Sequence, residues 1–265
     1  MWSIWILTVC VFLQSFQETK WELKKKVGLE GRSLNADSQE NLYCLSELGK
    51  VARYDSTLVN TAQFSLNLLN TPSYIETWNR LNVMLFYKES QQIIFLDRFL
   101  QLRNEYRLQD FQNAYFTAVA TSANGTLWAF DSSSLRLLRL SPQNGEVLFD
   151  WFLNDLDYYP EVIFLREFEN FLFALDANKG ILIFDFLGNL LMTIEQEAIQ
   201  AIGFNKGECY FLSADGNQLN IISLSDFSKV TSLRLPQNAK SVVYLGEKLY
   251  LLNLSNELCY YNKSY

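Results

Sequence analysis

Residues 172–185 read LFALDANKGILIFD, two apolar runs separated by a polar stretch that ends in glycine. Short runs of aromatic and β-branched residues on either side of Asn, Lys and Gly are typical of a β-hairpin. Both runs are continuously apolar, whereas a strand with one face in water alternates between apolar and polar residues. The pattern therefore predicts a hairpin that is buried on both faces.

The same pattern occurs six times along the 265 residues. Measured at the residue that follows the first run, the repeats lie 42, 43, 45, 37 and 40 residues apart, at Ser46, Lys88, Asp131, Asp176, Ser213 and Asn253. A period of about 40 residues built from strand-like runs is typical of a β-propeller blade. Each repeat also has room for an inner strand before the hairpin and an outer strand after it. The sequence therefore predicts an all-β fold, a six-bladed β-propeller with four antiparallel strands in each blade.

The last repeat is incomplete, because the chain ends at Tyr265, directly after the third strand of that repeat. Residues 21–29 precede the first repeat and are free to supply the missing fourth strand. An N-terminal strand in this place would close the ring without a covalent bond and would cover the edges that an open ring exposes. We therefore expect the ring to be closed by residues 21–29.

The N-terminal residues 1–17 have the pattern of an export signal. Their apolar core of about a dozen residues suits a signal peptide and is too short for a membrane span, which needs roughly 20. We expect cleavage near residues 15–17, with a buried N-terminal strand as the alternative. No linker divides the rest of the chain, of which 49% is hydrophobic, so residues 18–265 are expected to form one domain without a transmembrane span.

Composition excludes several classes of function. The chain has 29 acidic and 22 basic residues, a net charge of −7, and an acidic surface repels nucleic acid. It has no histidine, which excludes imidazole-based catalysis and histidine-ligated metals. Cys44, Cys209 and Cys259 fall in predicted core strands without a metal or disulfide spacing. We therefore expect no metal and no cofactor, and any catalysis would have to use carboxylates.

The longest connection between repeats, residues 150–161, contains the main candidate site. Its carboxylates and aromatic residues are Asp150, Trp151, Asp155, Asp157, Tyr158, Tyr159 and Glu161. At the axial mouth of a propeller, such a group could bind a ligand or a partner. The simpler interpretation is a solvated connection whose aromatic residues cap the adjoining blades. Convergence of these carboxylates on a concave axial pocket would favour catalysis, because glycoside hydrolysis needs two of them close together.

Two further groups of residues lie beside blade turns. Arg98 and Arg103 could hold a carboxylate or phosphate in bidentate fashion, or could tie neighbouring blades together. Asp55, Asp97 and Asp185 recur at one position of the repeat. Recurrence indicates a turn-capping role that the blades share, and not chemistry unique to one of them.

Residues 87–103 and 178–185, together with Trp21, resemble segments of a family of exported, six-bladed propeller-like proteins (NHL/TolB-like) of Bacteroidota. The resemblance implies a periplasmic location, or one at the periplasmic face of the outer membrane. It further implies that the protein acts as an interaction or assembly subunit, for example in outer-membrane protein export. The family has no established active site whose residues could be assigned in this sequence.

Two functions remain open from the sequence. The first is a non-catalytic interaction module of the cell envelope, for example an accessory subunit of an outer-membrane complex such as a protein-export machine, with an envelope protein as its partner. The alternative is a carboxylate-dependent propeller that binds or hydrolyses glycans at the axial mouth.

Overall fold

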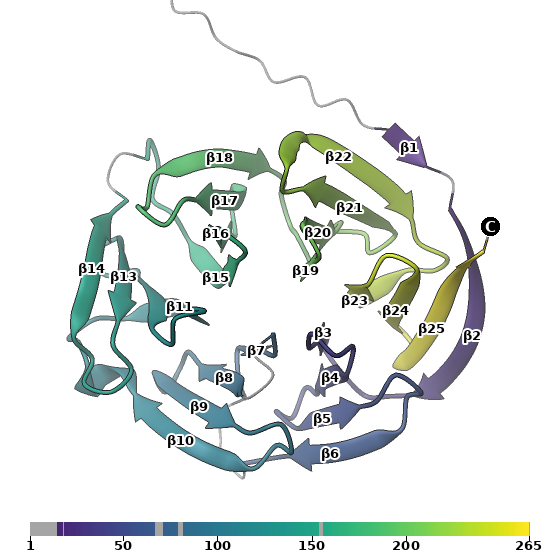
Figure 1. Ribbon diagram of the computed structural model, residues 1–265, viewed down its shortest axis with the longest axis horizontal. Coiled ribbons are helices and arrows are strands. Elements are labelled where there is room, and N and C mark those ends of the chain that lie inside the picture. Colours follow the sequence, from purple (N-terminus) through teal and green to yellow (C-terminus); the bar gives the residue numbers. More distant parts are fainter. Residues whose placement is uncertain (1–14, 18, 67–70, 79–81, 154–155, 265) are drawn as a thin grey trace, which may run out of the picture.

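The computed structural model describes residues 15–17, 19–66, 71–78, 82–153 and 156–264. They form an all-β ring of six blades around a central axis (Figure 1), and each blade is a sheet whose four ring strands are antiparallel to their neighbours. The six-bladed propeller that the repeat predicts is thus confirmed. The one helix among the described residues is a short 3-10 helix, η1 (Leu108–Asp110).

Each of the first five blades is built from four strands that follow one another along the chain, from the axis to the rim. Blade 1 contains β3 (Ser33–Ala36), β4 (Leu42–Leu45), β5 (Val51–Tyr54) and β6 (Asn60–Phe64). Blade 2 contains β7 (Tyr74–Glu76), β8 (Val83–Tyr87), β9 (Gln92–Leu96) and β10 (Leu102–Arg107). Blade 3 contains β11 (Phe116–Thr121), β12 (Leu127–Asp131), β13 (Arg136–Leu140) and β14 (Val147–Phe152).

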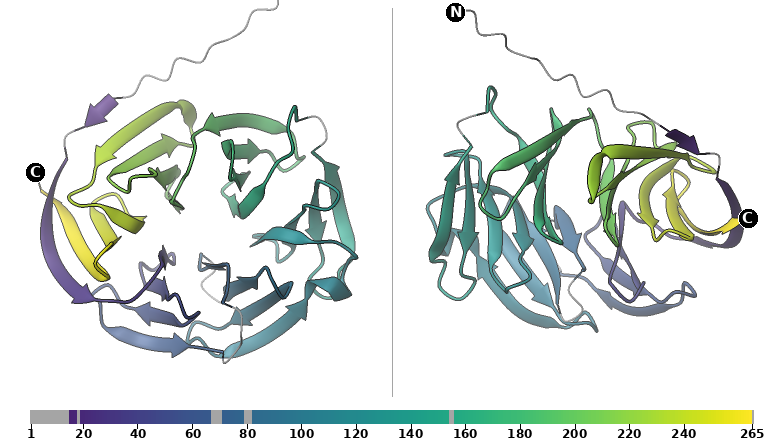
Figure 2. Two further views of the ribbon diagram at one scale, coloured as in Figure 1. Left: turned by 180° about the vertical axis from the view of Figure 1, so that it is seen from behind. Right: turned by 45° about the horizontal axis from the view of Figure 1, so that its top comes forward.

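Blades 4 and 5 follow the same order. Blade 4 contains β15 (Val162–Phe168), β16 (Phe171–Asp176), β17 (Gly180–Phe184) and β18 (Leu190–Glu195). Blade 5 contains β19 (Ala201–Asn205), β20 (Glu208–Leu212), β21 (Gln218–Ser223) and β22 (Asp226–Arg234). A fifth strand, β1 (Ser15–Gln17), pairs in parallel with the rim strand β22 and lies outside the ring in Figure 2. Residues 1–14 of the predicted export signal lie outside the described residues.

Blade 6 joins the two ends of the chain. Its strands β23 (Ala239–Tyr244), β24 (Lys248–Asn253) and β25 (Glu257–Ser264) come from the C-terminal end, and its rim strand β2 (Lys20–Gly28) comes from the N-terminal end. Strand β2 is antiparallel to β25, with Lys20 opposite Ser264 and Gly28 opposite Glu257. The predicted closure by an N-terminal strand is therefore confirmed, with bounds shifted by one residue.

The core consists of six apolar clusters, one between each pair of neighbouring blades. The middle strands contribute to the clusters on both sides of a blade, since Trp128 packs toward blade 4 and Leu127 toward blade 2. This double burial explains why these strands are apolar at consecutive positions. Cys44, Cys209 and Cys259 are buried free thiols in these clusters, as predicted.

The antiparallel order gives the ring two distinct faces. We call face A the face at which the inner strands β3, β7, β11, β15, β19 and β23 end, and face B the face at which they begin. The turns after first and third strands lie at face A, whereas the connections between blades lie at face B. The turn-capping prediction is confirmed at face A, because the Asp185 carboxylate accepts hydrogen bonds from the backbone N–H groups of Leu187 and Asn189. Asp55 and Asp97 do the same in their own turns.

None of the described residues belongs to a helix long and apolar enough to cross a membrane.

Candidate functional site

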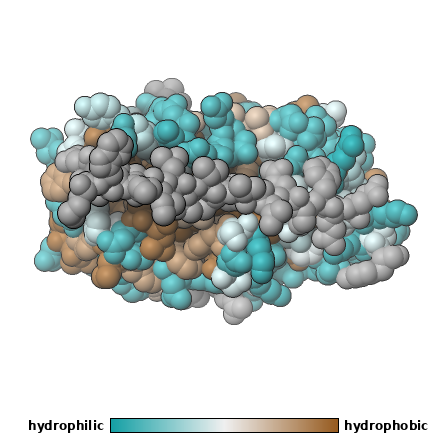
Figure 3. Space-filling model, turned by 90° about the horizontal axis from the view of Figure 1, so that it is seen from above, coloured by the Kyte–Doolittle hydropathy of each residue, from teal (hydrophilic) through white to brown (hydrophobic). Residues whose placement is uncertain are grey.

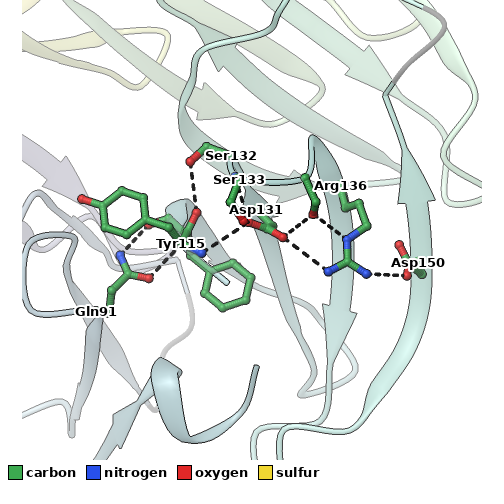
Figure 4. A network of polar contacts seen from close by, with 9 residues as sticks. Gln91, Tyr115, Asp131, Ser132, Ser133, Arg136 and Asp150 are labelled. Carbon is green, nitrogen blue, oxygen red and sulfur yellow. Dashed lines mark hydrogen bonds and ion pairs between the residues drawn. The ribbon is translucent and has the colours of Figure 1, made fainter. Parts of the chain in front are cut away.

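The predicted site at residues 150–161 begins in a strand, which corrects the expectation that all of it is a connection. Asp150 and Trp151 lie in β14, where half-buried and exposed side chains alternate. Asp150 accepts a hydrogen bond from Arg136 Nη1 at 3.0 Å, and Arg136 Nη2 lies 3.4 Å from Asp131 (Figure 4). Burial raises the pKa of Asp131, but hydrogen bonds from Ser133 and Ser134 outweigh it, and the net pKa is lowered. Asp150 is therefore part of a network of polar contacts that connects β14, β13 and β12.

The remaining residues of the predicted site lie at face B, between β14 and β15. Tyr158 is half-buried, with the Lys179 ammonium 5.2 Å from its ring centroid, and burial raises its pKa to about 12. Glu161 accepts a hydrogen bond from Asn178 Nδ2 at 3.4 Å. Asp157 and Tyr159 are exposed. The structure thus packs Tyr158 and Glu161 against the neighbouring turn of blade 4, and Asp155 lies outside the described residues.

Arg98 and Arg103 come from one side of blade 2 but do not act together. Arg98 lies in the turn after β9, with its guanidinium 4.7 Å from the ring centroid of Phe99. Arg103 lies in β10 and donates a hydrogen bond from Nη1 to Asn82 Oδ1 at 3.0 Å. Neither makes an ion pair with a carboxylate among the residues that the structure describes. They are separate cationic positions.

A cavity of about 440 Å³ opens on the propeller axis at face A. Strands β3, β7, β15, β19 and β23 line it, together with the turns that follow them. Its lining includes the aromatic residues Trp78, Phe164, Phe168, Phe204 and Tyr210. The described carboxylates of the predicted site, those of Asp150, Asp157 and Glu161, are not in its lining. The convergence on the axis that would favour catalysis is therefore not seen for these three.

The cavity contains an ion pair that sequence reasoning missed. Arg166 Nη1 and Glu76 Oε1 are 3.0 Å apart, and both residues are buried, at 8% and 4% exposure. The Arg166 guanidinium also lies over the rings of Trp78 and Phe204, at 5.0 and 5.8 Å. Its Nε atom is buried without a hydrogen-bond partner among the described residues.

Burial acts on both members of this pair in the direction that disfavours charge. It lowers the pKa of Arg166 to about 10, against the opposing effect of Glu76. It raises the pKa of Glu76, against the opposing effect of Arg166. The second oxygen of Glu76 accepts hydrogen bonds from the backbone N–H and the hydroxyl of Thr121 in blade 3. The pair therefore joins blades 2, 3 and 4 around the axis.

A second buried carboxylate, that of Glu167, directly follows Arg166 in β15. Glu167 accepts hydrogen bonds from Ser122 Oγ at 2.6 Å, Ala123 N–H at 2.9 Å and Trp128 Nε1 at 2.6 Å. Because protein donors satisfy both Glu76 and Glu167, neither is free to act as a general acid or base. Arg and Glu inside the otherwise apolar run VIFLREF were the only signal in the sequence that could have indicated this site. Within the described ranges, no group of three or more His, Cys, Asp or Glu residues could hold a metal ion.

An apolar cluster lies on the rim of blade 4. Within six consecutive positions, four large apolar residues are partly or largely exposed, namely Phe186, Leu187, Leu190 and Leu191. In the view of the rim in Figure 3, hydrophobic residues gather in the left half, on the side where β14 and β18 lie in Figure 1. We call these four residues the rim cluster.

The turn between β17 and β18 carries Phe186 and Leu187 of the rim cluster and is fixed by hydrogen bonds and packing, whereas Leu190 and Leu191 lie in β18. Asp185 caps the turn, and Gly188 takes the left-handed conformation at φ +81°. A Cβ atom at Gly188 would overlap the Trp151 ring of blade 3. The equivalent position of blade 2 carries Leu100 at φ +60°, so blade 4 has a glycine here because Trp151 occupies the space. Trp151, a predicted partner-binding residue, thus packs against Gly188 in the turn that carries Phe186 and Leu187.

Comparisons with known proteins identify the fold. No protein-family model matches the sequence, and no curated protein matches it in sequence. Among solved structures, BBS1N in complex with ARL6DN aligns with 94% of this chain and 98% of its own, at 10% identity and a TM-score of 0.61. Virginiamycin B lyase from Staphylococcus aureus aligns with 92% of this chain and 99% of its own, at 12% identity and a TM-score of 0.59. BamB from Moraxella catarrhalis aligns with 92% of this chain and 100% of its own, at 9% identity and a TM-score of 0.54.

These likenesses show a shared fold and no shared activity. A variant of the lyase in which one histidine is replaced by alanine is described as catalytically inactive. This chain contains no histidine. The residue on which that lyase depends therefore has no counterpart here.

Proposed function

We propose that this protein is a non-catalytic interaction module that binds a macromolecular partner through the rim cluster of blade 4. The observation that carries the proposal is the exposure of Phe186, Leu187, Leu190 and Leu191 in one short segment. Scattered apolar residues are normal on protein surfaces, but contiguous ones indicate interaction sites. Large apolar side chains with few charges among them are also the usual composition of an interface core.

The rigidity of the segment supports the same proposal. Binding is weakened by the entropy lost when flexible groups become ordered. The turn between β17 and β18 is already fixed by the Asp185 cap and by the contact between Gly188 and Trp151. A partner would therefore meet a preformed surface, and little ordering would oppose association.

Catalysis has less support from the described residues. The absence of histidine removes imidazole chemistry. The buried carboxylates at the axis are occupied by protein donors, and Asp150 is paired with Arg136. The similarity in fold to a protein solved in complex with ARL6DN is consistent with a role in protein binding. The four described carboxylates that line the axial cavity, those of Asp37, Glu40, Glu76 and Glu169, each have a protein hydrogen-bond donor. The carboxylate-dependent glycan function at the axial mouth therefore has less support than partner binding.

The cellular setting of the proposal rests on the sequence. The export-like residues 1–17 and the resemblance to exported propeller-like proteins favour the periplasm or the periplasmic face of the outer membrane. An envelope protein is accordingly the proposed partner, for example a component of an outer-membrane complex that exports proteins.

A matched pair of leucines tests the proposal. Leu187 in the rim cluster and Leu254 in a turn at face B are each 69% exposed. A photo-crosslinking amino acid is placed at position 187 or at position 254 in cells that produce the protein, and crosslinked partners are identified by mass spectrometry. We expect one envelope protein to be crosslinked from position 187 and not from position 254.

The partner is then purified, and its affinity is measured for Leu187→Ser and Leu254→Ser. Truncation of a residue at the centre of an interface typically weakens binding by about tenfold or more. We expect that loss for Leu187→Ser and an unchanged affinity for Leu254→Ser. Equal crosslinking from both positions, or equal affinity of the two variants, would show that the rim cluster is not the binding surface.

A further inference from the structure

A groove of about 590 Å³ lies between blades 2 and 3, at face A and separate from the axial cavity. Its lining residues lie in β9, β10, β11 and β12 and in the turns at face A that follow β7, β11 and β13. Asn82, Asn104, Thr121, Thr126 and Gln143 give it a lining of amides and hydroxyls. Phe95 and Tyr106 add two aromatic rings in an edge-to-face contact, with centroids 5.9 Å apart.

Arg103 is the charged residue of this groove, and a shift in strand register brings it there. Along a regular strand Arg103 and Asn104 would point to opposite faces. In β10 the register shifts between Leu102 and Asn104, so Arg103 is an extra residue of a bulge, and both it and Asn104 line the groove. Bulges commonly redirect one side chain in this way.

The bulge recurs in other blades, but its residue differs. The rim strands of blades 1, 3, 4 and 6 have the same shift, and the extra residues are Thr61, Leu148, Leu191 and Lys24. A bulge at this position is thus a feature of the repeat, whereas an arginine at it is a feature of blade 2. The fold does not require a cation here, since threonine and leucine satisfy the same backbone geometry.

The charge of the groove is opposite to that of the chain. The chain carries a net charge of −7, yet none of the described residues that line the groove is acidic. The nearest carboxylate in sequence, Glu105, is bonded to Gln92, and it pairs across the sheet with Ile94, which packs toward blade 1. Arg103 gives one hydrogen bond to Asn82 and makes no ion pair with a described residue. An anion in the groove would therefore meet a guanidinium without a competing carboxylate.

From this combination we infer that the groove binds an acidic sugar, with Arg103 holding its carboxylate. A guanidinium binds a carboxylate through parallel N–H···O hydrogen bonds. The side-chain amides of Asn82, Asn104 and Gln143 offer donors and acceptors to several sugar hydroxyls. The hydroxyls of Thr121 and Thr126 are already bonded within the protein. The rings of Phe95 and Tyr106 offer apolar surface to the C–H groups of a pyranose. A hexuronate unit within an oligosaccharide has all three of these features.

Titration calorimetry with trigalacturonate tests the inference, with its fully methyl-esterified form as the uncharged counterpart. The protein is used with all 265 residues. Circular dichroism confirms the fold of each variant. We expect saturable binding of trigalacturonate and at least about tenfold weaker binding of the ester, because hydrogen bonds to charged groups contribute more than neutral ones. Arg103→Gln should weaken trigalacturonate binding by about tenfold or more and should leave binding of the ester little changed.

Arg98→Gln is the matched control, since Arg98 is an exposed arginine of the same blade whose one described contact is with Phe99. It should leave binding of trigalacturonate unchanged. Asn104→Ala should weaken binding of both saccharides, because it removes an amide that can bond to a sugar hydroxyl and does not change the charge of the groove. The inference would be overturned by an absence of trigalacturonate binding, by equal losses in Arg98→Gln and Arg103→Gln, or by tighter binding of triglutamate, which would assign the groove to acidic peptides.

Discussion

Replacement of Arg166 by methionine should destabilise the ring in a manner that depends on pH. The change removes the positive member of a buried ion pair 3.0 Å long and leaves Glu76 at 4% exposure without its counter-charge. Methionine keeps much of the volume and can contact the aromatic rings beside it. Breaking one partner of a buried pair typically costs about 3–5 kcal/mol of unfolding free energy. We expect a loss of that size at pH 8.

The pH dependence follows from Glu76. Burial already raises its pKa, and Arg166 opposes that rise, so removal of Arg166 raises the pKa of Glu76 further. A group whose pKa is higher in the folded than in the unfolded state contributes stability below its unfolded pKa and loses it as pH rises through the folded pKa. The variant should therefore recover stability as pH falls from 8 to 5, by at most about 1.4 kcal/mol per pH unit.

Urea denaturation monitored by circular dichroism at pH 5 and pH 8 measures this effect. The comparison is between Arg166→Met and the double variant Arg166→Met/Glu76→Gln, in which the titrating group is absent. The double variant should be the more stable of the two at pH 8, and the difference should become smaller at pH 5. A difference that stays the same at both pH values would refute the assignment of the pH effect to Glu76.

Three other changes test the fold. Gly188→Ala should lower the unfolding free energy by about 2–4 kcal/mol, because the added methyl group overlaps the ring of Trp151. Gly125→Ala should lower it by only about 1 kcal/mol, since φ is +83° there but no atom lies within 4 Å of the added Cβ. Equal losses of unfolding free energy in urea denaturation would contradict this account. Deletion of residues 1–28, which contain β2, should cause aggregation that deletion of residues 1–19 does not, as light scattering would show, because it exposes the edge of β25. The thiol of Cys44 should resist DTNB at pH 8 until the protein unfolds, because burial raises its pKa to about 12; rapid labelling of the native protein would disprove burial in solution.

The features that the sequence predicted correctly are those that repeat or that follow from local chemistry. The middle strands of each blade are buried on both faces, so continuous apolar runs such as residues 181–184 mark them at every period. The caps at Asp97 and Asp185 depend on backbone groups only two and four residues away. The closing strand could be predicted because the last repeat lacks one strand.

The features that could not be predicted depend on contacts between distant blades. Glu76 and Arg166 are 90 residues apart, and nothing local indicates that the ring brings them together. Asp150 and Trp151 were assigned to a connection because a rim strand is exposed on one side and contains polar residues, as a loop does. The register shift at Arg103 likewise has no signature in the sequence, since neighbouring blades have the same shift around other residue types.

The order in which the blades complete themselves follows from the strand β2. Blades 1 to 5 pair residues that are close along the chain, so each can form soon after its own segment is available. Blade 6 needs both ends, and its hydrogen bond from Ser264 Oγ to the carbonyl of Lys20 spans 244 residues. Such distant pairings form slowly, because chain entropy is lost when the ends meet, before the stabilising contacts between them have formed. Ring closure is therefore expected to be the final event of folding, and until it occurs the edge of β25 is available to other chains.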